Sequence, residues 1–329
     1  MCYASVVNIL LVGGAGAVGQ VYGYHLQRGG ARVSLFVRPK AAASCERGTV
    51  LYPLVRRGER VGVKFKADRV FTSLDEVARA GTERPWDEVW FCVAADALDE
   101  EWLASIARAV DGARIVALPP GIDSEQRLRR AFPKSEIVPA LIGMVSYQAP
   151  LPGEAVPEPG IAFYFPPGNP TVFGGPHGKA VAAELSRGGC RAIAKKDAAT
   201  GSAFGSSILM PVVAGLEAAG WSLRAFRQGA LPALAARAAR EAIAITAASL
   251  GVGAPLVRFL VRGVTLKLAS WIAPKLVPLD LEAYLRHHFT KVGGQTRLFF
   301  AQYRKDAEAR GLESGALASL LERADHASS

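Results

Sequence analysis

The hydrophobic residues of the N-terminal half are grouped into short runs, separated by segments rich in glycine, proline and charge. The first run, residues 6–12, is interrupted only by Asn8, and similar runs follow at Val33–Val37, Val89–Val93 and Ile115–Leu118. A short, continuous apolar run is typical of a parallel strand that is buried on both faces. Because helical or turn-rich segments separate these runs, the pattern predicts βαβ units and a parallel sheet.

The pattern changes around residues 150–170, where the sequence becomes rich in Pro and Gly. Two short apolar segments, residues 161–165 and 171–175, lie in or beside this region. They predict edge strands or a hairpin that completes the first domain.

Beyond about Asp197, helical periodicity rich in Ala and Leu replaces the strand pattern. The clearest example is the segment that ends on Gly251, a glycine suited to cap the C-terminus of a helix. We therefore predict an α/β fold with a Rossmann-type, doubly wound sheet in residues 1–195. An all-helical domain for substrate binding or dimerisation is expected in residues 196–329.

A glycine motif, G-x-G-x-x-G, follows the first apolar run directly and precedes an amphipathic segment. In that context the first glycine permits a tight turn, the second lets the backbone approach a pyrophosphate, and the third lets the helix pack on the strand. Free backbone N–H groups in the turn can hold the phosphate, whereas a tight turn without a ligand is the alternative. The predicted phosphate-binding residues are Gly14, Ala15, Gly16, Ala17, Val18 and Gly19.

The second predicted strand ends on a cation, Arg38, followed by Pro39 and Lys40. At this position a carboxylate binds the ribose 2′-OH of NAD, while an arginine accommodates the 2′-phosphate of NADP. Since there is no acid at the strand end and two cations lie there, the sequence predicts NADP as the cofactor. The alternative is a solvated surface arginine.

The overall charge agrees with an anionic ligand, because 39 Lys and Arg outnumber 29 Asp and Glu and give a formal net charge of +10. There is no long basic run and no base-stacking motif, so we expect no nucleic-acid partner. The four cysteines are isolated, without metal-site spacing, and indicate reduced thiols in a cytoplasmic protein. We also expect no metal, no signal peptide and no membrane-spanning helix.

The first 175 residues resemble the ketopantoate reductase family. The segments that carry the resemblance are NILLVGGAGAVGQVYGYHL, VSLFVRP, TSLDEV, DEVWFCVAADAL and IVALPPGIDSEQRLRRAFP. The resemblance places the glycine motif, Arg38, Val93 and Ala94 at cofactor positions, and it becomes weaker in the helical half. It implies reduction of a 2-oxo acid by NADPH.

The positions that carry catalysis in that family hold other residues here. Pro119-Pro120-Gly121 stands in place of a Gln-Asn-Gly segment, and Ala94 in place of a lysine. The family's lysine and glutamate of the helical domain fall near Ser202 and Gln295. Because a serine cannot supply the ammonium that protonates a nascent alkoxide, we predict that ketopantoate itself is not reduced.

One stretch of the helical half, LEAYLRHHFTKVGGQ, contains groups that could replace the missing ones. Helical spacing puts His288 and Lys291 on or beside one face, together with Tyr284. We assign Lys291 as proton donor or carboxylate anchor, with His288 and Gln295 as its hydrogen-bonding partners. The alternative is a helix capped at the following glycine pair, with Lys291 extending into water and His288 bonded to backbone.

Two more segments have several interpretations. Gly201 and Gly205, and likewise Ser202 and Ser206, recur at four-residue spacing and predict a close helix contact. The basic-apolar segment, residues 255–279, could lie on a membrane surface, although a lid, a dimer contact or a packed helix pair is more common in a soluble enzyme. Its four cations, together with Pro274 and Pro278 near its end, exclude a membrane span.

The prediction is therefore an NADPH-dependent oxidoreductase that transfers hydride to the carbonyl or imine carbon of a small anionic substrate. The helical domain is expected to exclude water from that reaction, and a homodimer is one option for the assembly. The second hypothesis is a non-catalytic NADP-binding sensor or regulatory protein, because the family's catalytic positions are replaced.

Overall fold

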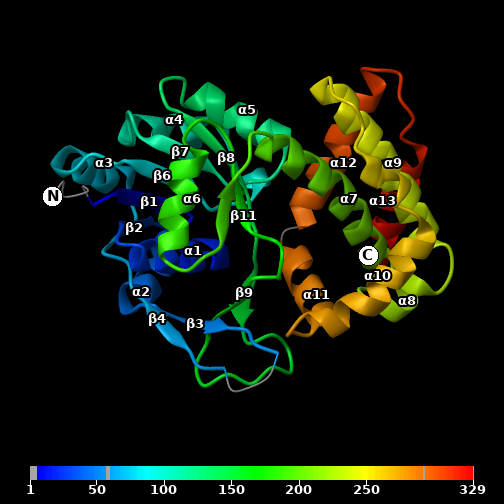
Figure 1. Cartoon of the computed structure of the whole chain (residues 1–329), viewed down its shortest axis with the longest axis horizontal. Coiled ribbons are helices and arrows are strands. Elements are labelled where there is room, and N and C mark those ends of the chain that lie inside the picture. Colours follow the sequence, from blue (N-terminus) through cyan, green and yellow to red (C-terminus); the bar gives the residue numbers. More distant parts are fainter. Residues whose placement is uncertain (1–5, 57–59, 292, 329) are drawn as a thin grey trace. The chain divides into compact units, whose positions relative to one another are not determined.

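The structure is a computed structural model that describes residues 6–56, 60–291 and 293–328. The chain divides into two compact units, an N-terminal unit of residues 1–199 and a helical unit of residues 200–329 (Figure 1). The N-terminal unit combines strands with helices, and the helical unit contains no strand in its described part. The predicted fold class is confirmed.

The main sheet of the N-terminal unit has eight strands in the order β12-β11-β8-β7-β6-β1-β2-β5. Neighbouring strands are parallel except for β8 and β11. The chain runs outward from β1 to β2 and then returns to the other side of β1 at β6, so the strand order reverses between β1 and β6. The strands are β1 (Asn8–Val12), β2 (Arg32–Phe36), β5 (Arg69–Phe71), β6 (Glu88–Phe91), β7 (Arg114–Ala117), β8 (Ile137–Leu141), β11 (Thr171–Phe173) and β12 (Ala192–Ala194).

Both faces of the main sheet are buried, which explains the continuous apolar runs. In β1, Ile9 and Leu11 belong to one hydrophobic cluster, whereas Leu10 and Val12 belong to another on the opposite face. The first cluster includes residues of α1 (Ala17–Arg28) and α6 (Gly178–Arg187). The second includes residues of α3 (Leu74–Glu83), α4 (Glu100–Ala109) and α5 (Ile122–Ala131).

A second sheet of four strands, in the order β4-β3-β10-β9, packs in the cluster that contains α1. The two apolar segments around residues 161–175, predicted as edge strands or a hairpin, do not pair with each other, and neither lies at the edge of a sheet. The first lies inside the small sheet between β3 and β9, and the second lies inside the main sheet between β8 and β12. The strands of the small sheet are β3 (Thr49–Pro53), β4 (Val63–Phe65), β9 (Val145–Ala149) and β10 (Gly160–Tyr164).

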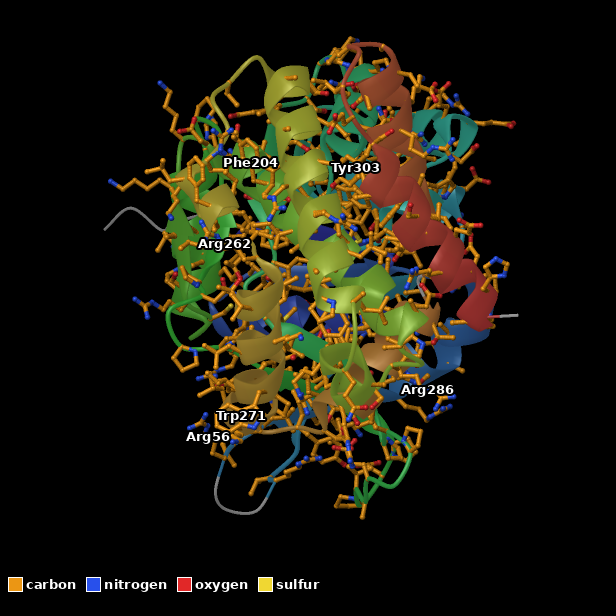
Figure 2. All side chains as sticks on the ribbon, turned by 90° about the vertical axis from the view of Figure 1, so that its right-hand side faces the viewer. Arg56, Phe204, Arg262, Trp271, Arg286 and Tyr303 are labelled. Carbon is orange, nitrogen blue, oxygen red and sulfur yellow. The ribbon has the colours of Figure 1, made fainter. Side chains whose placement is uncertain are left out.

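The helical unit is built around α9, which ends as predicted on Gly251 in a left-handed conformation, with φ +64°. Tyr303 of α12, labelled in Figure 2, belongs to the same core as Phe226 and Phe300. The helices are α7 (Ala198–Ala218), α8 (Leu223–Arg227), α9 (Leu231–Leu250), η2 (Leu256–Phe259), α10 (Gly263–Leu276), α11 (Leu281–Lys291), α12 (Gly293–Glu308) and α13 (Gly315–Ser328).

Among the described helices, only α7 is long and apolar enough to cross a membrane. Its most apolar window is 56% buried inside the protein, and Met210, Val213 and Ala214 belong to the core of the helical unit. The apolar composition of α7 is therefore explained by core packing.

The small residues of α7 differ in their surroundings within the helical unit. Inside this unit, a methyl group at Gly201 or Gly205 would meet no described atom within 4 Å, so packing there does not require glycine at either position. Ser202 and Ser206 are buried instead, and the Ser206 hydroxyl donates to the Ser202 carbonyl at 3.1 Å. The serine hydroxyl bonds within its own helix, which is common for serine in a helix interior.

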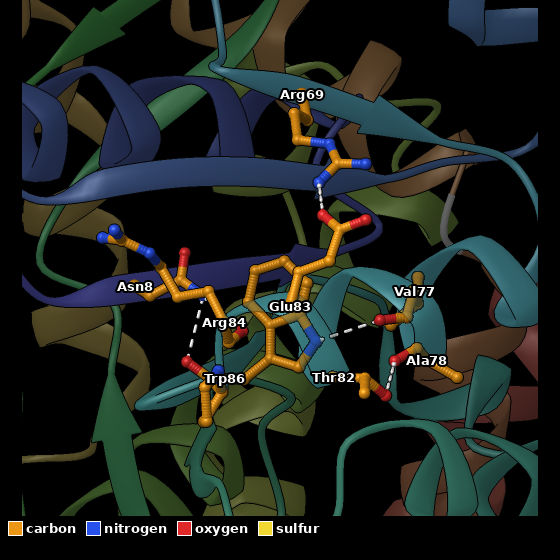
Figure 3. Close-up of polar contacts among 9 residues, drawn as sticks. Asn8, Arg69, Val77, Ala78, Thr82, Glu83, Arg84 and Trp86 are labelled. Atoms are coloured by element: carbon orange, nitrogen blue, oxygen red, sulfur yellow. Dashed lines mark hydrogen bonds and ion pairs between the residues drawn. The ribbon is translucent and has the colours of Figure 1, made fainter.

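The one polar residue in the first apolar run, Asn8, holds the loop that leads into β6 (Figure 3). Its side-chain amide donates to the carbonyls of Arg84 and Pro85 at 3.2 and 3.0 Å. The Trp86 indole N–H donates to the Val77 carbonyl of α3 at 3.2 Å, also visible in Figure 3. These bonds fasten the end of α3 and the start of β6 to β1, so the two strands at the point of reversal have a defined register.

Candidate functional site

The glycine turn, residues 13–19, connects β1 to α1 at the point where the strand order reverses. Gly13 has φ +75°, and a Cβ there would lie 2.5 Å from a methyl carbon of Val93. The sequence predicts the tight turn at Gly14, but Gly13 is the residue in the left-handed region. Gly14 is required for a different reason, because its Cβ would lie 2.7 Å from the Leu35 side chain.

Gly16 and Gly19 have contrasting surroundings. A Cβ at Gly19 would lie 2.7 Å from the Gly14 Cα, so this glycine permits the close approach of helix and turn that the sequence predicts. A Cβ at Gly16 would meet only the carbonyl oxygens of Gly13 and Cys92, at 3.4 and 3.9 Å. Packing inside the protein therefore does not require glycine at position 16, and the space beside it suits the close approach of a ligand to the backbone.

The N-terminus of α1 has the chemistry of an anion site. Gly16 is its N-cap, no side chain caps it, and its first turn contains no acidic residue. The first-turn N–H groups, which belong to Ala17, Val18 and Gly19, have no partner within the helix because each lacks a carbonyl one turn earlier. Together with the positive end of the helix dipole, they favour a phosphate group.

A residue that the sequence analysis missed, Gln20, fastens this turn. Its side chain is buried, and its amide donates to the Gly14 carbonyl at 2.7 Å and contacts the Cys45 sulfur at 3.8 Å. The sequence signal that could have identified Gln20 is a polar residue directly after the glycine motif, on the side of the helix that faces the strand. Gln20 keeps the turn in one conformation without occupying the space beside Gly16.

Arg38 and Lys40 lie at the neighbouring strand end. In the register of β1 and β2, Val12 is opposite Phe36, and the Gly13 N–H donates to the Phe36 carbonyl at 3.0 Å. Arg38 comes two residues later as the N-cap of α2 (Pro39–Arg47), and both cations are exposed. The structure thus brings Arg38 and Lys40 to the same edge of the sheet as the glycine turn, with no acid between Phe36 and Lys40.

The loop after β6 completes this edge. Val93 lies against Gly13, and Ala94 precedes a short 3-10 helix, η1 (Ala95–Ala97). In a doubly wound sheet, ligands bind outside the carboxyl ends of the strands at the point where the strand order reverses. The cofactor residues that the sequence predicts are therefore grouped at one edge of the N-terminal unit, where Pro119-Pro120-Gly121 also follows β7.

The predicted catalytic residues belong to the helical unit, where α11 carries two of them. Leu281, Leu285 and Phe289 pack against the core, whereas the Tyr284 and His288 rings stack on one another with centroids 5.4 Å apart. Lys291 is the last residue of α11 and is exposed. The two aromatic side chains and the ammonium thus follow a stripe of α11 beside its buried face.

The electrostatics of α11 distinguish these groups. Burial lowers the pKa of His288 to about 4, and the positive charges of Lys291 and His287 contribute to the shift. His288 is therefore neutral at pH 7 and can donate or accept a hydrogen bond, but it is not an imidazolium acid. Burial raises the pKa of Tyr284 to about 12, so its hydroxyl keeps its proton.

The third predicted catalytic residue, Gln295, belongs to α12. α11 ends at Lys291 and α12 begins at Gly293, with Val292 outside the described residues. Gln295 lies in the first turn of α12 and is half-buried. Among the described residues there is no group of three His, Cys, Asp or Glu side chains that could hold a metal ion.

Residues 10–156 match the sequence model of the family described as "Ketopantoate reductase PanE/ApbA". The N-terminal part of the chain is therefore similar in sequence to this family. Its glycine turn, the end of β2 and the loop after β6 all lie inside the matched segment, whereas the helical unit lies outside it. No curated protein matches the sequence at a significant level.

Solved structures with the same fold cover both units. A PanE/ApbA family ketopantoate reductase from Ralstonia eutropha is 19% identical, with a TM-score of 0.70 and coverage of 98% of this chain and 100% of that chain. A 2-dehydropantoate 2-reductase from Geobacter metallireducens is 17% identical, with a TM-score of 0.69 and coverage of 98% and 100%. A D-mandelate dehydrogenase, solved with NADH and anilino(oxo)acetate, is 13% identical, with a TM-score of 0.70 and 97% coverage of both chains.

Proposed function

We propose that this protein is an NADPH-dependent oxidoreductase that reduces the carbonyl or imine carbon of a small anionic substrate other than ketopantoate. The observation that carries the proposal is the open backbone at Gly16 beside the uncapped N-terminus of α1, with Arg38 at the adjacent strand end. A pyrophosphate fits the first feature and a 2′-phosphate fits the second. The family match of this segment supports the same class of reaction.

The cofactor, when bound, supplies the hydride, and the protein must supply orientation and a proton. Backbone N–H groups of the glycine turn hold the pyrophosphate, and the Arg38 guanidinium pairs with the 2′-phosphate. Lys291 serves as proton donor or carboxylate anchor, since the neighbouring His288 is neutral at pH 7 and lacks the charge for either role. His288 and Gln295 contribute hydrogen bonds to the substrate.

Ketopantoate is excluded from the proposal by the residues at the family's catalytic positions. Ala94 and Pro120 have no side-chain group that could bind a substrate carboxylate or hydroxyl. Ser202 is buried within α7, and a hydroxyl there does not replace an ammonium. A different small anion, held by Lys291, is compatible with these replacements.

The decisive experiment is a screen of NADPH oxidation against 2-oxo acids, ketones and imines, with ketopantoate included as a substrate. We expect turnover on a member of the panel and rates on ketopantoate far below the ordinary enzymatic range of about 1 s⁻¹ or more. Ordinary turnover of ketopantoate would show that the residue matching is wrong.

The replaced catalytic positions also favour a second candidate, an NADP-binding protein without turnover. Both candidates require tight NADPH binding, which nicotinamide fluorescence measures directly. Tight binding without oxidation on any panel member would support the sensor, whereas absence of NADPH binding would contradict both candidates.

A further inference from the structure

The basic-apolar segment exposes large hydrophobic side chains over most of its length. In η2 and the residues after it, Leu256 is 81% exposed and Leu260 is 67% exposed. In α10, Val264 is 69%, Leu268 54% and Trp271 53% exposed. Single exposed hydrophobic residues are ordinary, but a contiguous group of this kind marks a surface that contacts another apolar phase.

α10 carries apolar side chains on its outward side as well as on the side that faces the core. Leu266 packs against the core of the helical unit, and Ser270 is buried. The outward side carries the exposed stripe, which consists of Val264, Leu268, Trp271 and Lys275. Spacings of four, three and four residues put these side chains on one helical face.

Figure 2 labels Arg262 and Trp271 on this helix. Arg262 is its N-cap and Trp271 lies two turns further along, so the stripe extends over the whole helix from its first turn. Lys267, which is exposed and lies four residues before Trp271, flanks this stripe with a cation.

The charges within the basic-apolar segment all have one sign. Between Glu241 and Asp280 the sequence contains no acidic residue, whereas it contains Arg258, Arg262, Lys267 and Lys275. Two of these cations lie over exposed aromatic rings. Arg258 is 4.7 Å from the Phe259 ring centroid, and the Lys275 ammonium is 3.3 Å from that of Trp271.

Exposed apolar side chains flanked by cations favour an anionic lipid surface as the partner over a second copy of this chain. A two-fold dimer through this face would bring two sets of four cations together without a single acidic partner from the same segment. An anionic lipid surface offers both complementary features, because its headgroups attract Lys and Arg while its acyl boundary accepts Leu, Val and Trp. Tryptophan is also enriched at the membrane interface.

We propose that the basic-apolar segment binds the surface of an anionic membrane, with α10 parallel to the surface and the exposed stripe in the headgroup boundary. The 14 residues of α10 are too short to cross a bilayer, which needs about 20 apolar residues in a helix. The binding is therefore peripheral and reversible, and it does not depend on the oxidoreductase activity.

Flotation of the full-length protein with lipid vesicles tests the proposal. Vesicles of phosphatidylcholine alone are compared with vesicles that also contain phosphatidylserine at about 30%. We expect binding to the anionic vesicles only, with a decrease at high ionic strength. Quenching of Trp271 fluorescence by brominated acyl chains, lost in Trp271→Phe, reports insertion of the stripe.

Two double variants separate charge from hydrophobicity. Lys267→Gln/Lys275→Gln should weaken binding by about 30-fold, since each cation near an anionic surface contributes about fivefold. Leu268→Gln/Trp271→Gln keeps the charge and should weaken binding by about tenfold or more. The matched control, Arg304→Gln/Lys305→Gln, removes two exposed cations from α12 and should bind like the unmodified protein.

The proposal is overturned by equal binding to neutral and anionic vesicles, or by no binding to either. It is also overturned if the α12 control loses as much affinity as Lys267→Gln/Lys275→Gln, because net charge would then be responsible. If Leu268→Gln/Trp271→Gln converts a dimer to a monomer in analytical ultracentrifugation, a second copy covers the stripe and the membrane assignment is wrong.

Discussion

Replacing Arg38 by alanine tests the cofactor assignment most directly. Arg38 begins α2 two residues after the β2 carbonyl that accepts a hydrogen bond from Gly13, so its guanidinium is available to a nucleotide held at the glycine turn. A hydrogen bond between charged groups contributes about 1.5–3 kcal/mol. Because Arg38 is exposed and therefore partly screened by solvent, the lower value applies, which is about tenfold in affinity. Arg38→Ala should weaken NADPH binding by that factor and leave NADH binding unchanged.

The matched control for this measurement is Arg47→Ala. Arg47 is also exposed, and its replacement by alanine removes the same charge as Arg38→Ala. It lies at the C-terminal end of α2, about 13 Å along the axis from Arg38. At physiological ionic strength the screening length is about 8 Å, so Arg47 should contribute little. Titration by nicotinamide fluorescence compares both variants with both cofactors. If the NADPH preference survives in Arg38→Ala, or falls equally in Arg47→Ala, the 2′-phosphate assignment is refuted.

Four other variants test further features of the structure. Gly16→Ala should weaken NADPH binding by at least about tenfold with little change in stability. Gly19→Ala, which places a Cβ against backbone, should instead lower the free energy of unfolding by about 1–3 kcal/mol. If titration and denaturant unfolding show the reverse, the assignment of the phosphate site to the glycine turn is contradicted. Lys291→Met should lower kcat/KM by about 100-fold and leave NADPH affinity and thermal stability unchanged. The control variant, Lys305→Met, should keep full activity. Full activity in Lys291→Met would contradict the proposed role of Lys291. Burial and the negative charge of Glu88 raise the pKa of Glu184 from 4.5 to about 7, so the folded protein keeps a proton that the unfolded chain releases and stability falls as pH rises through this range. Glu184→Gln should flatten that part of the profile in urea unfolding, and an unchanged slope would rule out Glu184 as its source.

The parallel sheet could be predicted because its signals are local. A strand buried on both faces is apolar at every position, and the glycine motif specifies the connection between the first strand and its helix. The same locality explains the correct end of α9 at Gly251, where a single glycine in the left-handed region terminates the helix. The structure shifts the predicted strand ends by one or two residues only.

The second sheet could not be predicted from such signals. β10 pairs with β3, more than 100 residues earlier in the chain, and with β9 on its other side. Nothing in a short apolar segment encodes a partner at that separation, so the sequence suggested the nearest possible pairing, a hairpin. The assignment of the tight turn failed for a related reason, because Gly13 and Gly14 are adjacent and only the three-dimensional contacts with Val93 and Leu35 separate their roles.

The two parts of the candidate site differ in how far the sequence could predict them. The proposed cofactor part depends on backbone groups and on one strand-end cation, so its residues could be recognised by spacing alone. Its catalytic part depends on side chains such as Lys291 and His288, whose surroundings are set by tertiary packing. Helical spacing placed both on α11, but the neutral state of His288 follows from burial beside a cation, which sequence spacing does not encode.

In the proposed enzyme, cofactor binding and catalysis depend on different residues, and they can change independently. The glycine turn can bind a dinucleotide through N–H groups that every side-chain replacement in the helical unit leaves intact. Under the proposed function, Ser202 and Pro120, in place of the family's lysine and asparagine, remove one reaction without removing the cofactor. In the proposed enzyme, Arg38→Ala changes which cofactor binds and Lys291→Met changes how fast the bound cofactor is used. A protein in which Arg38 controls NADPH affinity while Lys291 affects no reaction would instead have kept the first function and lost the second.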